Sequence, residues 1–226
     1  MDAESNARYL TPEQARGVYN RIGRFQDWQA IYESRALQEV VRFGTFTSSR
    51  SVFEFGCGTG AFAARLLKTC LPADCRYAGL DVSPRMIRLA TSRLKPWAGR
   101  AGVRLSDGSP HLQEADASFD HFVSNYVFDL LSPAYASVVL AEAHRILGDG
   151  GKLCLVSLTH GPSLFSRIFT KAWERCWRWK PALLGGCRPV ELRDLLSAQD
   201  WSIEHQSTVV SFGVPSEVIV ASRRAQ

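Results

Sequence analysis

The chain has 226 residues, which fits one domain with an elaboration and is long enough to bury a sizeable core. Its 46% hydrophobic and 22% charged residues argue against a disordered chain, and its six cysteines include no Cys-x-x-Cys pair. The net charge of +5, the polar start and the absence of a long apolar run argue against a nucleic-acid-binding protein, a secretory signal and a membrane-spanning helix, so we expect a cytoplasmic protein.

The first 48 residues are predicted to be mainly helical. Thr11-Pro12-Glu13-Gln14 has the sequence of a helix start, with a capping threonine, a proline in the first turn and a glutamine that completes a capping box. Residues 27–43 place apolar side chains on one helical face. We therefore expect a helical cap over residues 1–48, followed by one domain over residues 49–226.

From residue 51 onward, strand patterns alternate with helix patterns. Strands are predicted at residues 51–55, 77–80, 103–105, 119–124, 152–158, 201–210 and 217–221. Helices are predicted at residues 61–69, 86–94, from Ser132 to near Gly148, and at 189–197, with a turn at 149–151. This alternation predicts an α/β fold with a mainly parallel sheet and helices on both faces.

A β-rich run that ends at three glycines and leads into a helix is the strongest signal in the chain. The glycines are Gly56, Gly58 and Gly60. Because glycine adopts positive φ and lets the backbone approach a ligand closely, we expect this loop under a nucleoside-like molecule. Asp81 ends the next strand, 21 residues after Gly60. A carboxylate at about that spacing commonly binds both hydroxyls of a ribose.

A plain turn between a strand and a helix is the structural alternative for this loop, with Asp81 as the cap of the next helix. Asp107, followed by Gly108, ends the weak third strand and is placed to reach an adenine edge. Because such residues stand at three successive strand ends, which meet at one edge of a parallel sheet, the pattern favours a ligand site over a plain turn.

Dinucleotide binding is the chemical alternative. Gly56, Gly58 and Ala61 fit the G-x-G-x-x-G/A pattern of dinucleotide-binding loops. Glu54, two residues before the first glycine, weighs against this interpretation. A diphosphate disfavours a nearby carboxylate, whereas a cationic sulfonium that also carries an ammonium group is attracted to one.

Four stretches in chain order resemble the motifs of class I S-adenosylmethionine-dependent methyltransferases. Residues 54–60 (EFGCGTG) resemble the first motif and residues 79–86 (GLDVSPRM) the second. Residues 106–120 resemble the third and fourth motifs, and residues 142–151 resemble the helix and turn before the fifth strand. The resemblance implies a Rossmann-like sheet of seven strands, mainly parallel, with a reversed last strand.

The general likeness is to the methyltransferases of ubiquinone and menaquinone biosynthesis. Residues 16–22 (RGVYNRI) are similar to the tyrosine-containing entry helix of that group, although Asn20 stands where an aspartate usually follows the tyrosine. The resemblance implies S-adenosylmethionine as the cofactor. It places Glu54 and Gly56 near the amino-acid part of the donor, and Gly58 and Gly60 along its path.

The resemblance also assigns the nucleoside part of the donor. It implies that Asp81 holds the ribose hydroxyls and that Val82 and Met86 lie against adenine. Asp107 would accept a hydrogen bond from the adenine amine, and the Gly108 amide would donate one to the ring.

Methyl transfer from a sulfonium is an in-line displacement, so positioning and exclusion of water do much of the catalysis. The resemblance implies that Asn125 and Tyr126, just past the fourth strand, face the methyl group. His160, at the carboxyl end of the fifth strand, is the candidate base, with a solvated loop histidine as the alternative. Because no Cys, His and carboxylate residues have ligand spacing, we predict no metal.

An insertion over about residues 161–188 interrupts the last part of the domain, and its residues 165–179 interleave aromatic and basic side chains. We expect it to form a lid over the acceptor. Contact with a membrane surface and a structural cover that completes the core are the alternatives. The predicted acceptor residues are Trp173 and Trp177 of this stretch and Tyr19 and Trp28 of the entry helix.

These observations predict an enzyme that transfers a methyl group from S-adenosylmethionine to a small-molecule, apolar, aromatic or lipidic acceptor. The expected location is the cytoplasm, with peripheral membrane contact as the alternative use of the aromatic and basic stretch. A nicotinamide-dependent oxidoreductase on a similar sheet and a non-catalytic protein with a retained donor pocket are the alternative functions.

Overall fold

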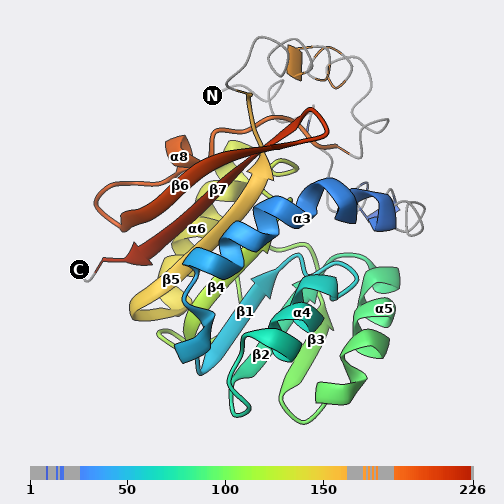
Figure 1. Cartoon of the computed structure of the whole chain (residues 1–226). Helices are drawn as coiled ribbons and strands as arrows, with labels where there is room; N and C mark the ends of the chain where they lie inside the picture. Colours follow the sequence, from blue (N-terminus) through green and yellow to red (C-terminus); the bar gives the residue numbers. More distant parts are fainter. Residues whose placement is uncertain are drawn as a thin grey trace.

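A seven-stranded sheet of order β3-β2-β1-β4-β5-β7-β6 forms the centre of the computed structural model (Figure 1). The structure describes residues 9, 14, 16, 17, 26–161, 170, 171, 173, 175, 177 and 186–224, with the backbone alone for residues 26–34. The strands are β1 (Ser51–Phe55), β2 (Arg76–Asp81), β3 (Ala101–Leu105), β4 (Phe119–Asn125), β5 (Leu147–Leu158), β6 (Trp201–Ser211) and β7 (Val214–Arg223). Strand β7 runs antiparallel to both β5 and β6, and the remaining neighbours are parallel, so the predicted sheet with one reversed strand is confirmed.

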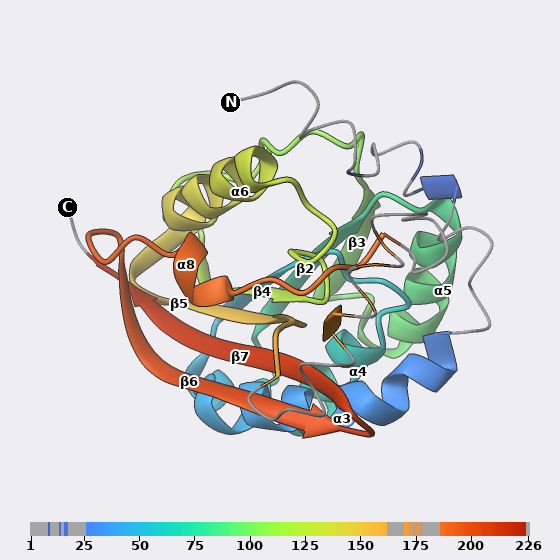
Figure 2. The same cartoon turned by 90° about the horizontal axis from the view of Figure 1, so that it is seen from above.

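Helices cover both faces of the sheet, as predicted. Figure 1 and the view from above in Figure 2 show α3, α4 and α5 on one face and α6 with α8 on the other. The helices are α3 (Gln26–Phe43), α4 (Ala61–Thr69), α5 (Pro84–Leu94), α6 (Pro133–Ile146) and α8 (Leu192–Leu195), and the 3-10 turns are η1 (Phe46–Ser48) and η2 (Lys95–Trp97). Each face has its own hydrophobic cluster, because alternate side chains of a buried strand point to opposite sides.

Two helices begin at the serine–proline pairs found in the sequence. Ser83 Oγ accepts a hydrogen bond of 3.3 Å from the Met86 amide, and Ser132 Oγ accepts one of 3.3 Å from the Tyr135 amide. A proline follows each serine in the first helical turn, where its missing N–H has no helical partner to lose. These caps fix where α5 and α6 start, and therefore where the loops after β2 and β4 end.

Helix α3 is part of the same core as the sheet. It packs against β5, β6 and β7, and its Ala36 and Val40 are fully buried in the cluster that contains Val52 and Val218. The division of the chain between residues 48 and 49 stays a prediction. Of the helices that the structure describes, none combines the length and apolar character needed to cross a membrane.

Two predicted elements differ from the structure. The predicted helix over residues 189–197 is wrong in extent, since only α8 is helical there. The Val190 amide instead donates to Leu158 O at 2.8 Å, which draws this segment to the sheet edge before a helix can begin. The turn predicted at residues 149–151 lies within β5, because Leu147 already pairs with Phe119 across a register shift.

We predict that Gly60→Ala destabilises the protein by about 2 kcal/mol. Gly60 has a φ of +71°, and an added Cβ would lie 3.1 Å from the Ala90 Cα of α5, whose backbone has no room to retreat. Gly150→Ala is the matched control, because Gly150 has a φ of +69° but open space around it. The control should lose only about 1 kcal/mol in urea unfolding. Equal losses would show that the contact with α5 contributes nothing.

Candidate functional site

The glycine loop after β1 is fastened to the end of β2. The amides of Gly56 and Cys57 both donate to Leu80 O at 2.9 Å, and the Gly60 amide donates to Cys57 O at 2.9 Å. A Cβ on Gly56 would lie 2.4 Å from a methyl carbon of Val127, so the loop after β4 packs directly against it. The loop therefore has a fixed shape at the carboxyl edge of the parallel strands, where ligands of such sheets bind.

Glu54 is a buried carboxylate beside this loop, with 2% of its surface exposed. Tyr77 of β2 donates its hydroxyl to Glu54 Oε2 at 2.6 Å, and Asn125 of β4 donates Nδ2 to Glu54 Oε1 at 3.3 Å. Burial raises the pKa of Glu54 to about 7, against the lowering effect of these two bonds. Among the described residues no lysine or arginine pairs with Glu54. A cationic ligand would therefore favour its ionised form.

Asp81 connects the glycine loop to the start of α5. Its Oδ2 accepts the Gly58 amide at 2.9 Å and its Oδ1 accepts the Ser83 amide at 2.8 Å. Burial raises the pKa of Asp81, and the two amide bonds oppose that shift. Each carboxylate oxygen can accept a further hydrogen bond, so these contacts are compatible with a ribose ligand. The side chain of Met86 is buried, with 1% exposed, below this turn.

The turn after β3 is closed by its own side chains. Exposed Asp107 accepts the Ser109 amide at 2.8 Å through Oδ1, and the Gly108 amide donates to Ser106 Oγ at 3.1 Å. Tyr135 of α6 donates its hydroxyl to Gly108 O at 2.9 Å. An adenine ring that takes a hydrogen bond from the Gly108 amide would therefore replace the serine hydroxyl.

Arg16 is a residue of this edge that the sequence analysis did not single out. Its Nε donates to Val82 O at 3.0 Å and its terminal nitrogen donates to Ser106 O at 3.5 Å. The side chain thus joins the amino-terminal segment to the ends of β2 and β3. Arg16 lies in the stretch similar to the entry helix, but sequence spacing carries no information about which carbonyls it meets.

The structure separates the two residues predicted to face the methyl group. Asn125 is bonded to Glu54, and its Oδ1 is buried without a hydrogen-bond partner. Tyr126 adopts a φ of 55° and places its hydroxyl 2.8 Å from Ser216 Oγ on β7. Asn125 therefore belongs to the group formed by Glu54, Asp81 and the glycine loop, whereas the Tyr126 hydroxyl reaches toward the reversed strand.

The predicted acceptor residues lie partly outside the described residues. Tyr19 falls outside them, and Trp28 lies in α3 where only the backbone is described. Trp173 and Trp177 donate their ring N–H groups to Cys187 O and Gly186 O, both at 2.9 Å. Trp177 is buried, with 9% exposed, and its ring meets Tyr9 edge-on at 5.8 Å.

His160 and Asp129 are two titratable residues near the end of β5. His160 is exposed and follows buried Thr159. Asp129, in the loop after β4, is buried with 1% exposed, and burial raises its pKa to about 7. The sequence analysis missed Asp129. The available signal was a single carboxylate between apolar Phe128 and Leu130 in a loop at the carboxyl edge.

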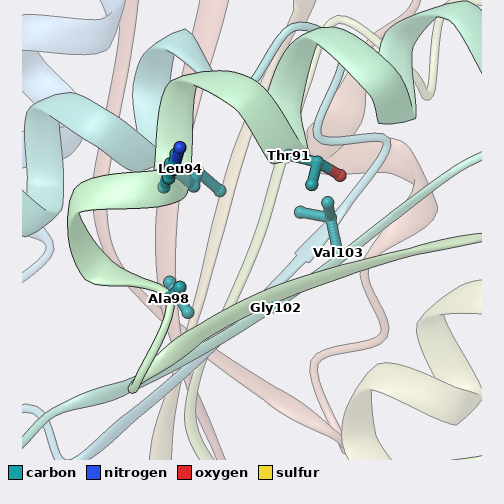
Figure 3. A pocket seen from close by; sticks show the side chains of 7 residues that line it. Thr91, Leu94, Ala98, Gly102 and Val103 are labelled. Atoms are coloured by element: carbon teal, nitrogen blue, oxygen red, sulfur yellow. The ribbon is translucent and has the colours of Figure 1, made fainter.

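A hollow on the surface lies apart from this site. Figure 3 shows Thr91, Leu94 and Ala98 from the end of α5 and the following turn facing Gly102 and Val103 of β3. These residues adjoin the amino end of β3, opposite the end that carries Asp107. Lys95 is the one ionisable residue among those that line the hollow. In the described part of the chain, no three His, Cys, Asp or Glu side chains gather as a metal site.

Comparison with known proteins identifies relatives of the sequence. A family model described as a methyltransferase domain matches residues 52–151. A demethylmenaquinone methyltransferase of Tropheryma whipplei (strain Twist) is 30% identical over 156 residues, which cover 69% of this chain and 61% of that protein. A malonyl-acyl-carrier-protein O-methyltransferase of Paenibacillus sp. (strain JDR-2) is 33% identical over 157 residues, 68% of this chain and 54% of that protein.

Two further matches differ from these relatives in their names. A tRNA(Thr) (cytosine(32)-N(3))-methyltransferase of Saccharomyces cerevisiae is 31% identical over 114 residues, 46% of this chain and 17% of that protein. The crystal structure of the cyclase SpnF has a TM-score of 0.74 and 14% identity, and the match covers 96% of this chain and 98% of that one. This second likeness shows the fold alone. The chain spans about 54–61% of the length of the first two relatives.

We predict that Glu54→Gln changes the pH dependence of stability. The raised pKa of Glu54 means that its contribution is fully present below the unfolded value near 4.5 and is lost as pH rises through about 7. Between pH 4.5 and pH 8 the wild type should therefore lose about 3 kcal/mol that the variant keeps, measured by urea unfolding.

Glu142→Gln is the control for this experiment. The hydrogen bonds from Arg145 lower the pKa of Glu142, so its contribution is already complete above the unfolded value. The difference between this variant and the wild type should stay constant from pH 5 to pH 8. If Glu54→Gln also ran parallel to the wild type over that range, Glu54 would be ionised throughout.

Proposed function

Because the chain carries a class I S-adenosylmethionine-dependent methyltransferase domain, we propose that it is an enzyme that transfers a methyl group to a small-molecule, apolar, aromatic or lipidic acceptor. The observation that carries this proposal is the Glu54 carboxylate, buried beside the glycine loop with hydrogen-bond donors and, among the described residues, no cationic partner. S-adenosylmethionine supplies a methyl group on a positively charged sulfonium, together with an ammonium group. Both charges suit an ionised Glu54.

The residues at the strand ends fit such a donor. Asn125 Oδ1 is a buried acceptor without a partner beside Glu54, which suits an ammonium group. Gly56, Gly58 and Gly60 would line the path of the donor, because a loop of glycines lets the backbone approach a ligand closely. Asp81 would accept from the ribose hydroxyls with the lone pairs that its amide bonds leave free.

The nucleoside part of the donor would lie at the carboxyl ends of β2 and β3. Val82 and Met86 would lie against the adenine ring, and Asp107 would accept from its amine. The Gly108 amide would donate to the ring once it leaves Ser106 Oγ. Arg16 holds the carbonyls of Val82 and Ser106 together above this end, so it would restrict the entrance on the adenine side.

The alternative functions make different demands on the same residues. A nicotinamide dinucleotide would bring a diphosphate to the glycine loop, next to the buried carboxylate of Glu54, which opposes it. A protein that binds the donor without transferring its methyl group would use the same donor residues. The fold neighbour SpnF is titled a cyclase, so the fold leaves the reaction open, and turnover is the measurement that decides.

We also propose the chemical class of the methyl acceptor. The relatives are named for a quinone, an acyl carrier protein and a tRNA. The aromatic stretch around Trp173 and Trp177 favours an apolar or aromatic molecule, because large rings provide apolar area that a polar macromolecule does not match. Its arginines and lysines would suit the anionic headgroups of a membrane that holds a lipidic acceptor. His160 would serve as a base if its ring comes within hydrogen-bond distance of the proton that the bound acceptor loses.

We predict that S-adenosylhomocysteine binds with a micromolar dissociation constant and that NAD does not bind. Asp81→Ala should weaken this binding by about 1.5–3 kcal/mol, as expected for hydrogen bonds to a charged group. Asp120→Ala is the control, because Asp120 also accepts two backbone amides, those of Arg50 and Ser51, but at the opposite edge. Calorimetry that detects NAD and not S-adenosylhomocysteine would favour the oxidoreductase.

We predict that replacing Trp173 and Trp177 by alanine lowers methyl transfer at least tenfold and leaves S-adenosylhomocysteine affinity within about twofold. The acceptors to be assayed are reduced demethylmenaquinone with a short side chain, malonyl-acyl-carrier protein and unmodified tRNA. Trp97→Ala, in the remote turn η2, is the control. Since Trp177 is buried, unfolding is measured first. A loss of several kcal/mol of stability would make the two tryptophans a structural cover instead.

A further inference from the structure

Buried polar atoms without partners gather at the carboxyl edge of the sheet. Native proteins satisfy nearly all buried polar groups, so such atoms call for a ligand, water or ion. In the part of the chain that the structure describes, six of them lie near the ends of β4, β5 and β6. They are Asn125 Oδ1, Asp129 Oδ1, Ser157 Oγ, Thr159 Oγ1, Arg188 Nε and Ser211 Oγ. The seventh, Arg223 Nε, belongs to the opposite edge.

Asp129 is the charged acceptor of this group. It is 1% exposed, and the Leu158 main chain and the Cys187 side chain lie close enough to oppose the rise that burial causes in its pKa. Its Oδ1 is buried without a hydrogen-bond partner. The main chain is fixed as well, because the Arg188 amide donates to Asp129 O at 3.1 Å. The unpartnered oxygen is therefore held at a defined position.

Arg188 is the charged donor of the group. Its terminal nitrogen donates to Leu131 O at 3.3 Å, and its guanidinium lies 5.0 Å from the centre of the Tyr9 ring. Its Nε is buried without a partner. The positive charge of Arg188 acts on Asp129, yet among the described residues no ion pair within 4.0 Å joins the two side chains. Each side chain thus keeps one unused polar atom.

We propose that Asp129 and Arg188 form a subsite that binds a hydroxyl group, phenolic or enolic, of the methyl acceptor, with Asp129 as a catalytic residue. This inference rests on the proposed methyl transfer. A hydroxyl donates to Asp129 Oδ1 and accepts from Arg188 Nε at the same time. An ammonium group is repelled by Arg188, and a carboxylate is repelled by Asp129. A hydroxyl is thus the acceptor group that suits both side chains.

The subsite supplies what an oxygen nucleophile needs. As the hydroxyl oxygen forms its bond to the methyl carbon, its proton moves to Asp129 Oδ1. The bond between methyl and sulfur breaks, and its electron pair stays on the sulfur, which becomes a neutral thioether. Arg188 Nε stabilises the negative charge that develops on the oxygen as the proton leaves. Charge and atoms balance, because the positive charge of the donor is replaced by the proton on the carboxylate.

The test uses the full chain saturated with S-adenosylhomocysteine and two ring-matched probes, 2-naphthol and 2-methoxynaphthalene. The wild type should bind 2-naphthol at least tenfold more tightly than its methyl ether. Asp129→Asn, which has nearly the same shape, should reduce this preference below threefold. With S-adenosylmethionine in place of the product, formation of 2-methoxynaphthalene should fall at least a hundredfold in the variant. Glu142→Gln, a carboxylate variant on α6, should keep the preference.

Different results would contradict the hydroxyl subsite and the proposed methyl transfer. Equal preference in wild type and Asp129→Asn, or a wild type that favours 2-naphthylamine over 2-naphthol, would overturn the hydroxyl subsite while donor binding stands. Failure of the wild type to bind S-adenosylhomocysteine would instead refute the proposed methyl transfer. If Asp129→Asn does not fold, Arg188→Met gives the same test, because it keeps much of the length of the side chain, removes the Nε donor and should abolish the preference for the hydroxyl.

Discussion

The hydrogen bonds that Glu54 accepts from Tyr77 and Asn125 join three neighbouring strands, β1, β2 and β4. A carboxylate buried to 2% exposure is costly unless donors or a positive charge compensate for the lost water, and among the described residues its hydrogen-bond donors are neutral. The glycine loop follows directly from the strand that carries Glu54. These hydrogen bonds do not neutralise the negative charge of Glu54. A proton or a cationic ligand would therefore stabilise the buried carboxylate.

The two sides of this edge are built in different ways. The side that carries the glycine loop consists of consecutive strand ends, and its contacts are mainly between backbone amides and side chains such as Asp81. The other side combines segments that are distant in sequence, since Asp129 after β4 meets Cys187 and Arg188 of the returning chain. Tyr9 packs on both Arg188 and Trp177.

Much of the fold and of the family was predictable because the relevant signals are local. The prediction of a class I methyltransferase domain that resembles the menaquinone group is confirmed, as is the sheet with one reversed strand. The helix predicted over residues 189–197 was too long, because the main-chain bonds of Arg188 to Asp129 and of Val190 to Leu158 hold the start of this segment out of a helix. The roles of the single site residues stay predictions, although Glu54, Asp81 and Asn125 do lie together.

The sequence by itself determined the order of the strands along the chain, the glycine loop and the carboxylates that follow it, since each depends on neighbours a few residues away. Only the tertiary structure decided which side chains meet across strands. Tyr77 reaches Glu54 because β1 and β2 pair in a register that sets Glu54 against Gly79. Arg188 reaches Asp129 because the chain returns to the edge of β5. Such contacts arise from packing over long sequence separations, which local patterns do not encode.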